Sequence, residues 1–291
     1  MFYDMPLYRP PSEGDNLIIQ ATLGCSYNQC SFCSMYKSKS YRERPLEAVF
    51  ADIAEAARAW PDASRVFLAD GDALGLPTEH LLAIAGRLAA AFPGLTRISA
   101  YGTPINLRRK TPEELGRLRA ARLSLLYLGI ESGSSEVLKR IAKGVTADAI
   151  ADAIAKARAA GMKVSATVVL GVGGKALAED HAAATAQLVN RAPPNYLSTL
   201  QLRLAADVAD GFLARWEDGF VPQGDAGMLA EQRLMLERLD PPSPVIFRSN
   251  HASNCLALAG TLPKDRSRLL AEVGGAATSG ERLRPRWLRQ L

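Results

Sequence analysis

The sequence predicts an α/β fold built from parallel strands. Short aliphatic and β-branched runs alternate with longer runs whose apolar residues recur at helical spacing. Repeated strand–helix units give parallel strands joined by right-handed crossovers. The chain has 291 residues and 48% hydrophobic content, which suffices for one large domain with a filled core. Periodicity alone leaves two architectures open, a partial (β/α)6 barrel and a doubly wound sheet.

Six strands are expected, at residues 17–23, 65–69, 97–101, 124–130, 163–170 and 197–202. The helices expected between them are at residues 46–60, 79–92, 112–121, 135–142, 147–160 and 176–190. Thr78, Thr111 and Ser134 stand where an N-cap side chain accepts a hydrogen bond from the first helical turn. Pro112 stands at a first helical position, where its missing N–H costs nothing.

The alternation weakens after residue 205. Helices are expected at 207–218, 225–239 and 263–273, with a last strand at 245–247 after a proline-rich break. We therefore divide the chain into a core over residues 1–205 and a C-terminal helical extension over residues 206–291 that closes it.

Charge and hydropathy narrow the functional class. The net charge is +5, but the basic residues are spread along helices except in the tail 281–289, so a solvated surface is favoured over nucleic-acid binding. No stretch approaches the eighteen or so apolar residues of a membrane span, and the first residues lack a signal-peptide pattern. Four cysteines, three of them close together, make no disulfide framework. A cytoplasmic protein without a membrane partner is expected.

Three cysteines, Cys25, Cys30 and Cys33, stand directly after the first expected strand. Three thiolates on one loop can bind three irons of a 4Fe–4S cube and leave the fourth iron open for a non-protein ligand. A structural zinc site normally has four protein ligands, yet the next histidine is His80 and the only other cysteine is Cys255. An iron–sulfur site is therefore favoured over a zinc knuckle.

The C-x4-C-x2-C spacing, with Phe32 before the last cysteine, resembles the radical S-adenosylmethionine (radical SAM) superfamily, whose usual pattern is C-x3-C-x2-C. Residues 68–74 and 128–134 are similar to the branch that contains Elp3-type and oxygen-independent coproporphyrinogen oxidase enzymes. The resemblance extends from residue 17 to residue 205. It implies a partial (β/α)6 TIM-like barrel with a C-terminal extension. It also implies a 4Fe–4S cluster on the three cysteines, with S-adenosylmethionine (SAM) on the open iron.

Ligands of parallel α/β folds lie beyond the carboxyl ends of the strands. The resemblance implies that SAM is met there and in the cysteine loop by Phe32, Gly71, Asp72, Tyr101, Glu131, Ser132, Gly171 and Arg203. Asp72 offers a negative partner for the SAM ammonium, and Glu131 reaches the ribose or methionine end. Gly171 begins a backbone platform for adenine. The competing interpretation gives these residues ordinary turn, cap, core and surface roles.

The segment 248–255 places six polar or reactive side chains directly after the last expected strand. We expect Asn250, His251 and Asn254 to help close the site or bind substrate, and Cys255 to lie close enough to donate a hydrogen atom or a thiolate. The competing interpretation is that the asparagines cap turns and that Cys255 is a small buried hydrophobic residue.

The resulting hypothesis is a radical SAM enzyme that cleaves SAM reductively to a 5′-deoxyadenosyl radical. Its substrate is an unidentified small molecule or peptide, and its reductant is a donor such as flavodoxin or ferredoxin. The alternatives are a tRNA-modifying enzyme of Elp3 type and a non-catalytic iron–sulfur or zinc module. A second four-cysteine cluster is excluded within this chain, because only Cys255 lies outside the loop.

Overall fold

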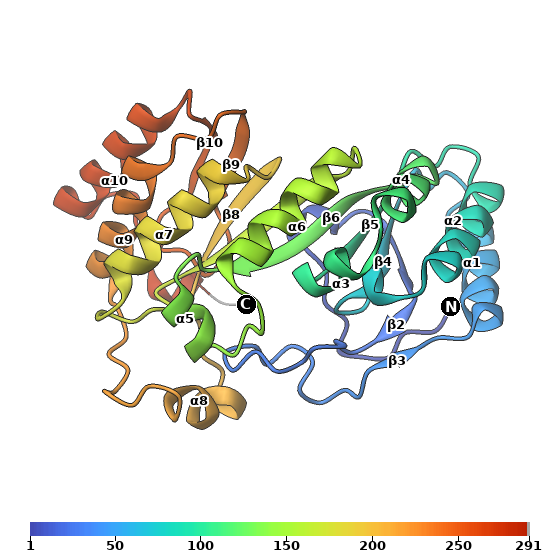
Figure 1. The fold of residues 1–291 in the computed structure, drawn as a ribbon, viewed down its shortest axis with the longest axis horizontal. Coiled ribbons are helices and arrows are strands. Elements are labelled where there is room, and N and C mark those ends of the chain that lie inside the picture. The colour runs from blue at the N-terminus through green and yellow to red at the C-terminus, as the bar shows by residue number, and fades with distance from the viewer. Residues whose placement is uncertain (290–291) are drawn as a thin grey trace. The chain divides into compact units, whose positions relative to one another are not determined.

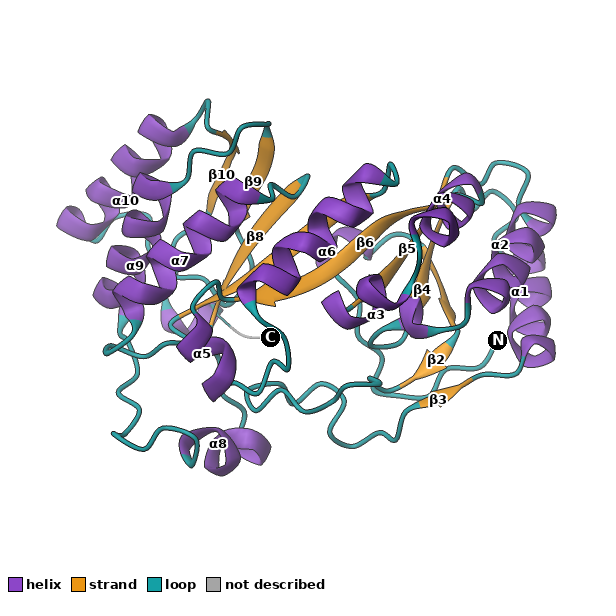
Figure 2. Cartoon of the chain, viewed as in Figure 1, coloured by secondary structure: helices purple, strands orange, loops and turns teal. Residues whose placement is uncertain are grey.

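A mostly parallel sheet of eight strands organises residues 1–289, the part of the chain that the computed structural model describes (Figures 1 and 2). The strand order is β1-β4-β5-β6-β7-β8-β9-β10. This confirms the predicted α/β fold with parallel strands. Within residues 1–289, no helix combines the length and the apolar character that crossing a membrane requires.

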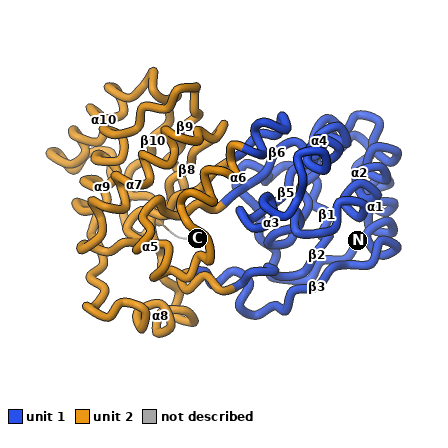
Figure 3. Tube along the Cα trace, viewed as in Figure 1, with its two compact units in different colours: residues 1–28, 33–128, 156–164 blue, residues 29–32, 129–155, 165–291 orange. Residues whose placement is uncertain are grey.

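The chain forms two compact units (Figure 3). The first unit contains residues 1–28, 33–128 and 156–164, and the second contains residues 29–32, 129–155 and the chain from 165 onward. The division falls inside β6 and β7. The predicted boundary at residue 205, between a core and a C-terminal extension, divides the chain in sequence order instead. This boundary stays a prediction.

The first unit carries four parallel strands and their covering helices. Its sheet pairs β1 with β4, β4 with β5 and β5 with β6, all in parallel. Its elements are β1 (Leu17–Gln20), β2 (Thr22–Leu23), β3 (Arg42–Glu43), α1 (Leu46–Ala59), β4 (Arg65–Ala69), α2 (Thr78–Ala91), β5 (Arg97–Gly102), α3 (Pro104–Arg109), α4 (Pro112–Ala120) and the first part of β6 (Leu123–Glu131). The single strand predicted over 17–23 is in fact β1 followed by β2, which pairs antiparallel with β3.

Helix starts confirm two of the three predicted caps. The Thr111 hydroxyl accepts from the Glu114 N–H in a capping box, and the Ser134 hydroxyl accepts from the Val137 N–H. The prediction for Thr78 was wrong, because it lies inside α2 and its hydroxyl donates to Glu114 at 2.7 Å. The unpredicted helix α3 begins with its own capping box on Thr103.

The second unit contains the remaining strands and three long helices. β7 and β8 pair in parallel, as do β8 and β9, whereas β9 and β10 form an antiparallel pair. Helix α9 packs against both α7 and α10 (Figure 1). The elements are α5 (Ser135–Arg140), α6 (Ala147–Ala159), β7 (Lys163–Leu170), α7 (Ala178–Arg191), β8 (Tyr196–Gln201), α8 (Ala206–Leu213), α9 (Asp225–Arg238), β9 (Val245–Ser249), β10 (Leu258–Leu262) and α10 (Arg266–Ser279). α6 and β7 contribute residues to both units.

The last predicted strand, at 245–247, is confirmed as the first part of β9. The predicted helix at 207–218 ends earlier, at Leu213, because the chain turns at residues 214 and 215. β10 was not predicted.

A buried carboxylate ties the N-terminal segment of the first unit to its sheet. Glu13 is fully buried and accepts hydrogen bonds from the Tyr127 hydroxyl and the Asn16 amide, both at 2.5 Å. It also accepts from Nη2 of Arg97 at 3.0 Å. Because an unpaired buried charge is costly, these donors offset the loss of water around the carboxylate.

We predict that Glu13→Ala lowers the free energy of unfolding by about 3 kcal/mol, since it leaves the partly buried Arg97 and the Tyr127 hydroxyl without their acceptor. Urea unfolding followed by circular dichroism measures this loss. The matched control is Glu79→Ala, which breaks the solvent-exposed pair with Arg117 and is expected to leave stability near the wild-type value. Equal stability of the two variants would contradict the role assigned to Glu13.

Candidate functional site

The cysteine loop, residues 24–33, follows β2 directly. Its three cysteines form no disulfide and are partly exposed. Cys25 and Cys33 belong to the first unit, and Cys30 lies in the segment 29–32 that belongs to the second. Because these residues are partly exposed and form no disulfide, their sulfur atoms can serve as ligands.

The start of the loop is anchored to the turn that follows β4. Asp72 in this turn is fully buried, and its carboxylate accepts from the backbone N–H of Ser26 at 2.9 Å and from the Ser26 hydroxyl. The N–H of Gly71 donates to the carbonyl of Gly24 at 3.0 Å. Burial raises the pKa of Asp72, while the Ser26 hydrogen bonds act in the opposite direction. Asp72 thus fixes the loop, a role that the sequence did not indicate.

A second buried carboxylate, Asp70, completes this anchor. Its Oδ2 accepts from Nζ of Lys39 at 2.9 Å, from the Gly24 N–H at 3.1 Å and from the Gln20 amide at 3.2 Å. Lys39 lies beyond the loop in sequence, so Asp70 holds residues on both sides of the cysteines. Its other oxygen, Oδ1, has no hydrogen-bond partner among the described residues. This oxygen is itself buried, and burial followed by the charge of Asp70 raises the pKa of the buried Tyr36 hydroxyl, so Oδ1 faces protein.

Gly71 allows the close approach of loop and turn. A Cβ at this position would lie 2.8 Å from Cβ of Cys25, 2.8 Å from Cε2 of Tyr36 and 2.9 Å from the Gly24 carbonyl oxygen. Contacts this short require the loop to shift. The fit of the cysteine loop against β4 therefore depends on glycine at position 71.

Tyr101, near the end of β5, belongs to an aromatic cluster in the first unit. Its ring packs edge-on against Phe67 with centroids 5.1 Å apart and against Tyr127 at 6.0 Å. Burial raises its pKa, and the nearby hydroxyl of Tyr127 and carboxylate of Asp70 act in the same direction. Tyr101 is therefore neutral and can contact a ligand only as a phenol.

At the end of β6, in the second unit, Glu131 adopts a φ of +61°, which is rare for a residue with a side chain. Its Oε1 lies 3.0 Å from Nζ of Lys143, and both side chains are largely buried. A Cβ at residue 129 would lie 1.9 Å from the same oxygen, so Gly129 makes room for the carboxylate. Strain of this kind collects at functional sites. Lys143 is a partner that the sequence did not indicate.

The residues after Glu131 pack onto α7. Ser132 is fully buried and hydrogen-bonds Nδ1 of His181 at 2.8 Å. The N–H of Gly133 donates to the Thr185 hydroxyl at 2.9 Å. The turn is thus held by side chains of a helix rather than by a neighbouring strand.

The end of β7 is held in a similar way by α9. Gly171 has a φ of +78°, and its N–H donates to Oε1 of Glu231 at 2.7 Å. A Cβ here would lie 2.2 Å from Cε of Met228. The backbone conformation and the packing both require glycine.

The C-terminal candidates lie in the second unit. Arg203 is exposed, with Nη1 3.4 Å from the carbonyl of Arg289. His251 is partly buried and hydrogen-bonds the Ser253 hydroxyl at 2.9 Å. Burial, followed by the charge of Arg284, lowers its pKa, so His251 is neutral near pH 7.

Cys255 and Asn254 are both buried. The Gln201 amide donates to Sγ of Cys255 at 3.0 Å, and burial raises the pKa of this thiol. The Asn254 amide donates to the Thr199 carbonyl at 2.7 Å and to the Ser249 hydroxyl at 2.8 Å, and its oxygen accepts from the Gln201 N–H. Protein groups bond both the nitrogen and the oxygen of the Asn254 side chain, which therefore joins the ends of β8 and β9. Its expected contact with substrate is not supported. Asn250 is exposed.

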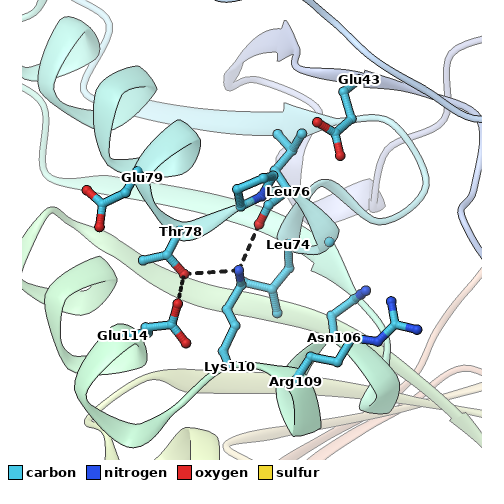
Figure 4. A pocket seen from close by; sticks show the side chains of 11 residues that line it. Glu43, Leu74, Leu76, Thr78, Glu79, Asn106, Arg109, Lys110 and Glu114 are labelled. Atoms are coloured by element: carbon cyan, nitrogen blue, oxygen red, sulfur yellow. Dashed lines mark hydrogen bonds between the residues drawn. The ribbon is translucent and has the colours of Figure 1, made fainter.

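A cavity of about 410 Å³ lies in the first unit, lined by residues 74–79 and by residues of α3 and α4 (Figure 4). The ammonium of Lys110 donates to the Leu76 carbonyl at 2.7 Å and lies 3.3 Å from the Thr78 hydroxyl, which in turn donates to Glu114. Burial lowers the pKa of Lys110. Protein acceptors take up this buried charge, so we assign the cluster a structural role.

Donor type and local packing at the cysteine loop fit an iron–sulfur cluster. The loop carries three cysteines that form no disulfide, and the close contacts around Gly71 fit its backbone against the turn after β4. Among residues 1–289, no three His, Cys, Asp or Glu side chains form a group that could hold a single metal ion. Cysteines of an iron–sulfur cube bind different irons, so they need not meet at one point.

Comparison with known proteins identifies relatives. The model of the radical SAM superfamily matches residues 19–189. A tRNA-2-methylthio-N(6)-dimethylallyladenosine synthase from Alkalilimnicola ehrlichii is 28% identical over 188 residues, which are 60% of this chain and 40% of that protein. The chain therefore spans less than half the length of this relative.

Solved structures share the fold at low sequence identity. Coproporphyrinogen III oxidase (HemN) from Escherichia coli matches with a TM-score of 0.58 at 18% identity, over 77% of this chain and 52% of that one. Methylornithine synthase (PylB) matches with 0.54 at 16% identity, over 89% and 69%. The archaeal Elp3 of Methanocaldococcus infernus matches with 0.53 at 11% identity, over 92% and 64%. These likenesses confirm the predicted TIM-barrel-like α/β fold.

We predict that Gly71→Ala reduces the iron and sulfide content of anaerobically reconstituted protein to less than half, because the added methyl group displaces the loop at Cys25. Chemical iron and sulfide analysis measures this loss. Gly86→Ala is the control, since a Cβ there meets nothing within 4 Å and alanine favours the helix. Full cluster content in Gly71→Ala would show that the loop tolerates the shift.

Proposed function

This chain belongs to the radical SAM superfamily and is an enzyme of that class, and we propose that Cys25, Cys30 and Cys33 bind the 4Fe–4S cluster on which its reaction depends. Held there, a reduced cluster would supply the one electron needed to cleave SAM to methionine and a 5′-deoxyadenosyl radical, which would remove a hydrogen atom from the substrate. The observation that carries the proposal is the position of three cysteines, none of them in a disulfide, on a fitted loop inside the region matched by the superfamily model.

The first unit contains the turn after β4 and the first and third cysteines of the loop, while the middle cysteine belongs to the second unit. Asp72 and Gly71 hold the loop in place, and the carboxylates of Asp70 and Asp72 place negative charge at this turn, which suits the SAM ammonium. The proposed contact with the SAM ammonium thus involves Asp70 as well as Asp72, since each carboxylate has lone pairs that accept hydrogen bonds. Tyr101 and Phe32 supply contact surface for the cofactor.

The second unit contributes the ends of β6, β7 and β8. Glu131 reaches the ribose or methionine end of SAM, with Lys143 holding the carboxylate in position. Ser132 and Gly171 supply polar and backbone contacts to the adenosine. Arg203 pairs with the SAM carboxylate.

Substrate chemistry is assigned to the segment around His251 and Cys255. A buried thiol with a raised pKa keeps its proton, which suits donation of a hydrogen atom. The substrate is a small molecule or peptide, and a flavodoxin or ferredoxin supplies the electron. We place the enzyme in the cytoplasm, where a reducing environment protects the cluster.

A tRNA substrate is the second candidate. The net charge of +5 is compatible with a polyanion, and the sequence relative is a tRNA-2-methylthio-N(6)-dimethylallyladenosine synthase. This chain has one cysteine outside the loop, so it supplies no second set of cluster ligands of its own. Cleavage of SAM that is stimulated by bulk tRNA, and not by peptides, would favour this candidate.

We predict that reconstituted wild-type protein binds iron and sulfide and forms 5′-deoxyadenosine from SAM on reduction with dithionite, whereas Cys30→Ala forms none. A cube held by two thiolates is labile, while the sheet core does not depend on it. Chromatography of the nucleoside product and metal analysis give the two readouts, with the exposed Ser38→Ala as control. Zinc without iron in the wild type, or full product from Cys30→Ala, overturns the proposed function.

We also predict that Glu131→Gln raises the Kd for SAM about tenfold, the effect of one lost charged hydrogen bond, without changing iron content. Anaerobic equilibrium dialysis measures this Kd. Lys143→Gln keeps the carboxylate but removes its ion pair, so a smaller rise is expected. The control is Glu136→Gln, a partly exposed carboxylate on α5. If SAM affinity is unchanged in Glu131→Gln, the residue serves only the turn.

A further inference from the structure

A chain of buried polar groups links the ends of β6 and β7 inside the second unit. It runs from the Ser132 hydroxyl to Nδ1 of His181 at 2.8 Å, and from Nε2 of His181 to Oε1 of Glu231 at 3.6 Å. The same Oε1 accepts from the Gly171 N–H at 2.7 Å. Two strand ends are thus joined through one residue of α7 and one of α9.

The two connecting side chains lie away from water. His181 and the Glu231 side chain are fully buried, and Nε2 of His181 has no hydrogen-bond partner among the described residues. Glu231 shares the inward face of α9 with Met228, Leu229 and Met235, where an apolar residue is expected. A buried carboxylate and a buried imidazole both cost free energy, so a packing role alone does not explain them.

Proton positions follow from the hydrogen-bond donors around Ser132, His181 and Glu231. The Ser134 N–H donates to the Ser132 hydroxyl at 3.0 Å, so this oxygen is already an acceptor. A neutral Glu231 can direct its O–H toward Nε2 of His181. The imidazole then carries its proton on Nδ1 and donates to Ser132. With Glu231 protonated, no charge is buried here. The Ser132–His181 and Gly171–Glu231 contacts are hydrogen bonds, whereas the 3.6 Å between Nε2 and Oε1 is longer than one.

The pKa shifts agree with this arrangement. Burial raises the pKa of Glu231 to about 7, although hydrogen bonds from Gly171 and Gln223 oppose the shift. Burial lowers the pKa of His181 to about 4, and Asp180, the nearby charge on α7, opposes that shift. Between about pH 4 and pH 7, both His181 and Glu231 are therefore mainly neutral.

We propose that His181 and Glu231 are positioning residues, which hold the Ser132–Ser134 turn and Gly171 in the geometry that binds SAM. This rests on the proposed function, because that function places Ser132 and Gly171 against the cofactor. Neither side chain is assigned a contact with SAM. Their effect passes through the two turns.

The pH dependence has a definite sign. The folded-state pKa of Glu231 lies above its ordinary 4.5, so its contribution to stability is complete below pH 4.5 and is lost as pH rises through about 7. Ionisation of the buried carboxyl therefore favours local opening of the turns. The pKa of His181 is shifted in the opposite direction, below its ordinary 6.5. Its contribution to stability is therefore complete above pH 6.5 and does not change near neutral pH.

Two substitutions test the proposal on the intact chain. His181→Phe keeps a ring of similar size but removes both polar contacts, whereas His181→Asn retains a group near the Nδ1 position that can bond Ser132. The control is Glu237→Gln, a carboxylate on the same helix as Glu231 that is paired with Arg233 at the surface. The readouts are amide hydrogen exchange at Gly133, Ser134 and Gly171 without SAM, the Kd for SAM, and iron content.

We expect His181→Phe to speed exchange at these amides and to raise the Kd for SAM about tenfold, with iron content unchanged and with His181→Asn closer to wild type. Exchange and Kd that stay within about twofold of wild type and of Glu237→Gln overturn the proposal. If wild-type protein binds no SAM, the proposed function fails, and the exchange rates still show whether His181 holds the turns.

Glu231→Gln decides the question if His181→Phe does not fold. It removes the ionisable group while keeping a side chain of the same size. Between about pH 6 and pH 8, wild-type exchange at Gly171, corrected for its intrinsic pH dependence, should rise and SAM affinity should fall. Both trends should be absent in Glu231→Gln. A variant that keeps the wild-type pH profile overturns the assignment of Glu231.

Discussion

The attachment of the cysteine loop to the turn after β4 is the constraint on which the first unit depends. Asp70 and Asp72 are two carboxylates buried within three residues, and each is stable only because the loop and its flanks supply donors. Ser26 donates from inside the loop, and Lys39 donates from beyond it. Turn and loop therefore order each other. The same residues that fix the cysteines offset the cost of burying two negative charges.

In the second unit, side chains of helices hold the strand ends in place. Backbone N–H groups at the ends of β6 and β7 have no neighbouring strand to bond, and buried N–H groups need acceptors. Helices supply them, as Thr185 does for Gly133 and Glu231 does for Gly171. An inward helix face must then carry polar groups among its apolar residues. The α7 and α9 helices contribute specific acceptors to the turns as well as covering the sheet.

Much of the architecture follows from local sequence, and most of the site's support does not. Alternating strand and helix patterns predicted the parallel strands, and the cap at Thr111 was correct because capping is a local interaction. Thr78 failed as a cap because its hydroxyl is used by Glu114, 36 residues away. Lys39 and Glu231 were missed for the same reason, since Asp70 lies 31 residues from the first and Gly171 lies 60 from the second. The sequence did carry one signal for Glu231, which is an acidic residue on the otherwise apolar face of α9.

The surroundings of Cys255 distinguish between its two expected roles, donor of a hydrogen atom and thiolate. The Arg284 N–H donates to the Cys255 carbonyl at 2.7 Å, and the Arg284 guanidinium donates to the carbonyl of His251 at 2.6 Å, so the tail holds this segment in place. A thiolate needs a positive, partly solvated setting that lowers its pKa, but burial raises the pKa here. The sulfur instead accepts a hydrogen bond from Gln201 and keeps its proton. A neutral thiol can donate a hydrogen atom but is a poor nucleophile. Of the two roles, hydrogen-atom donation is the one that this environment favours.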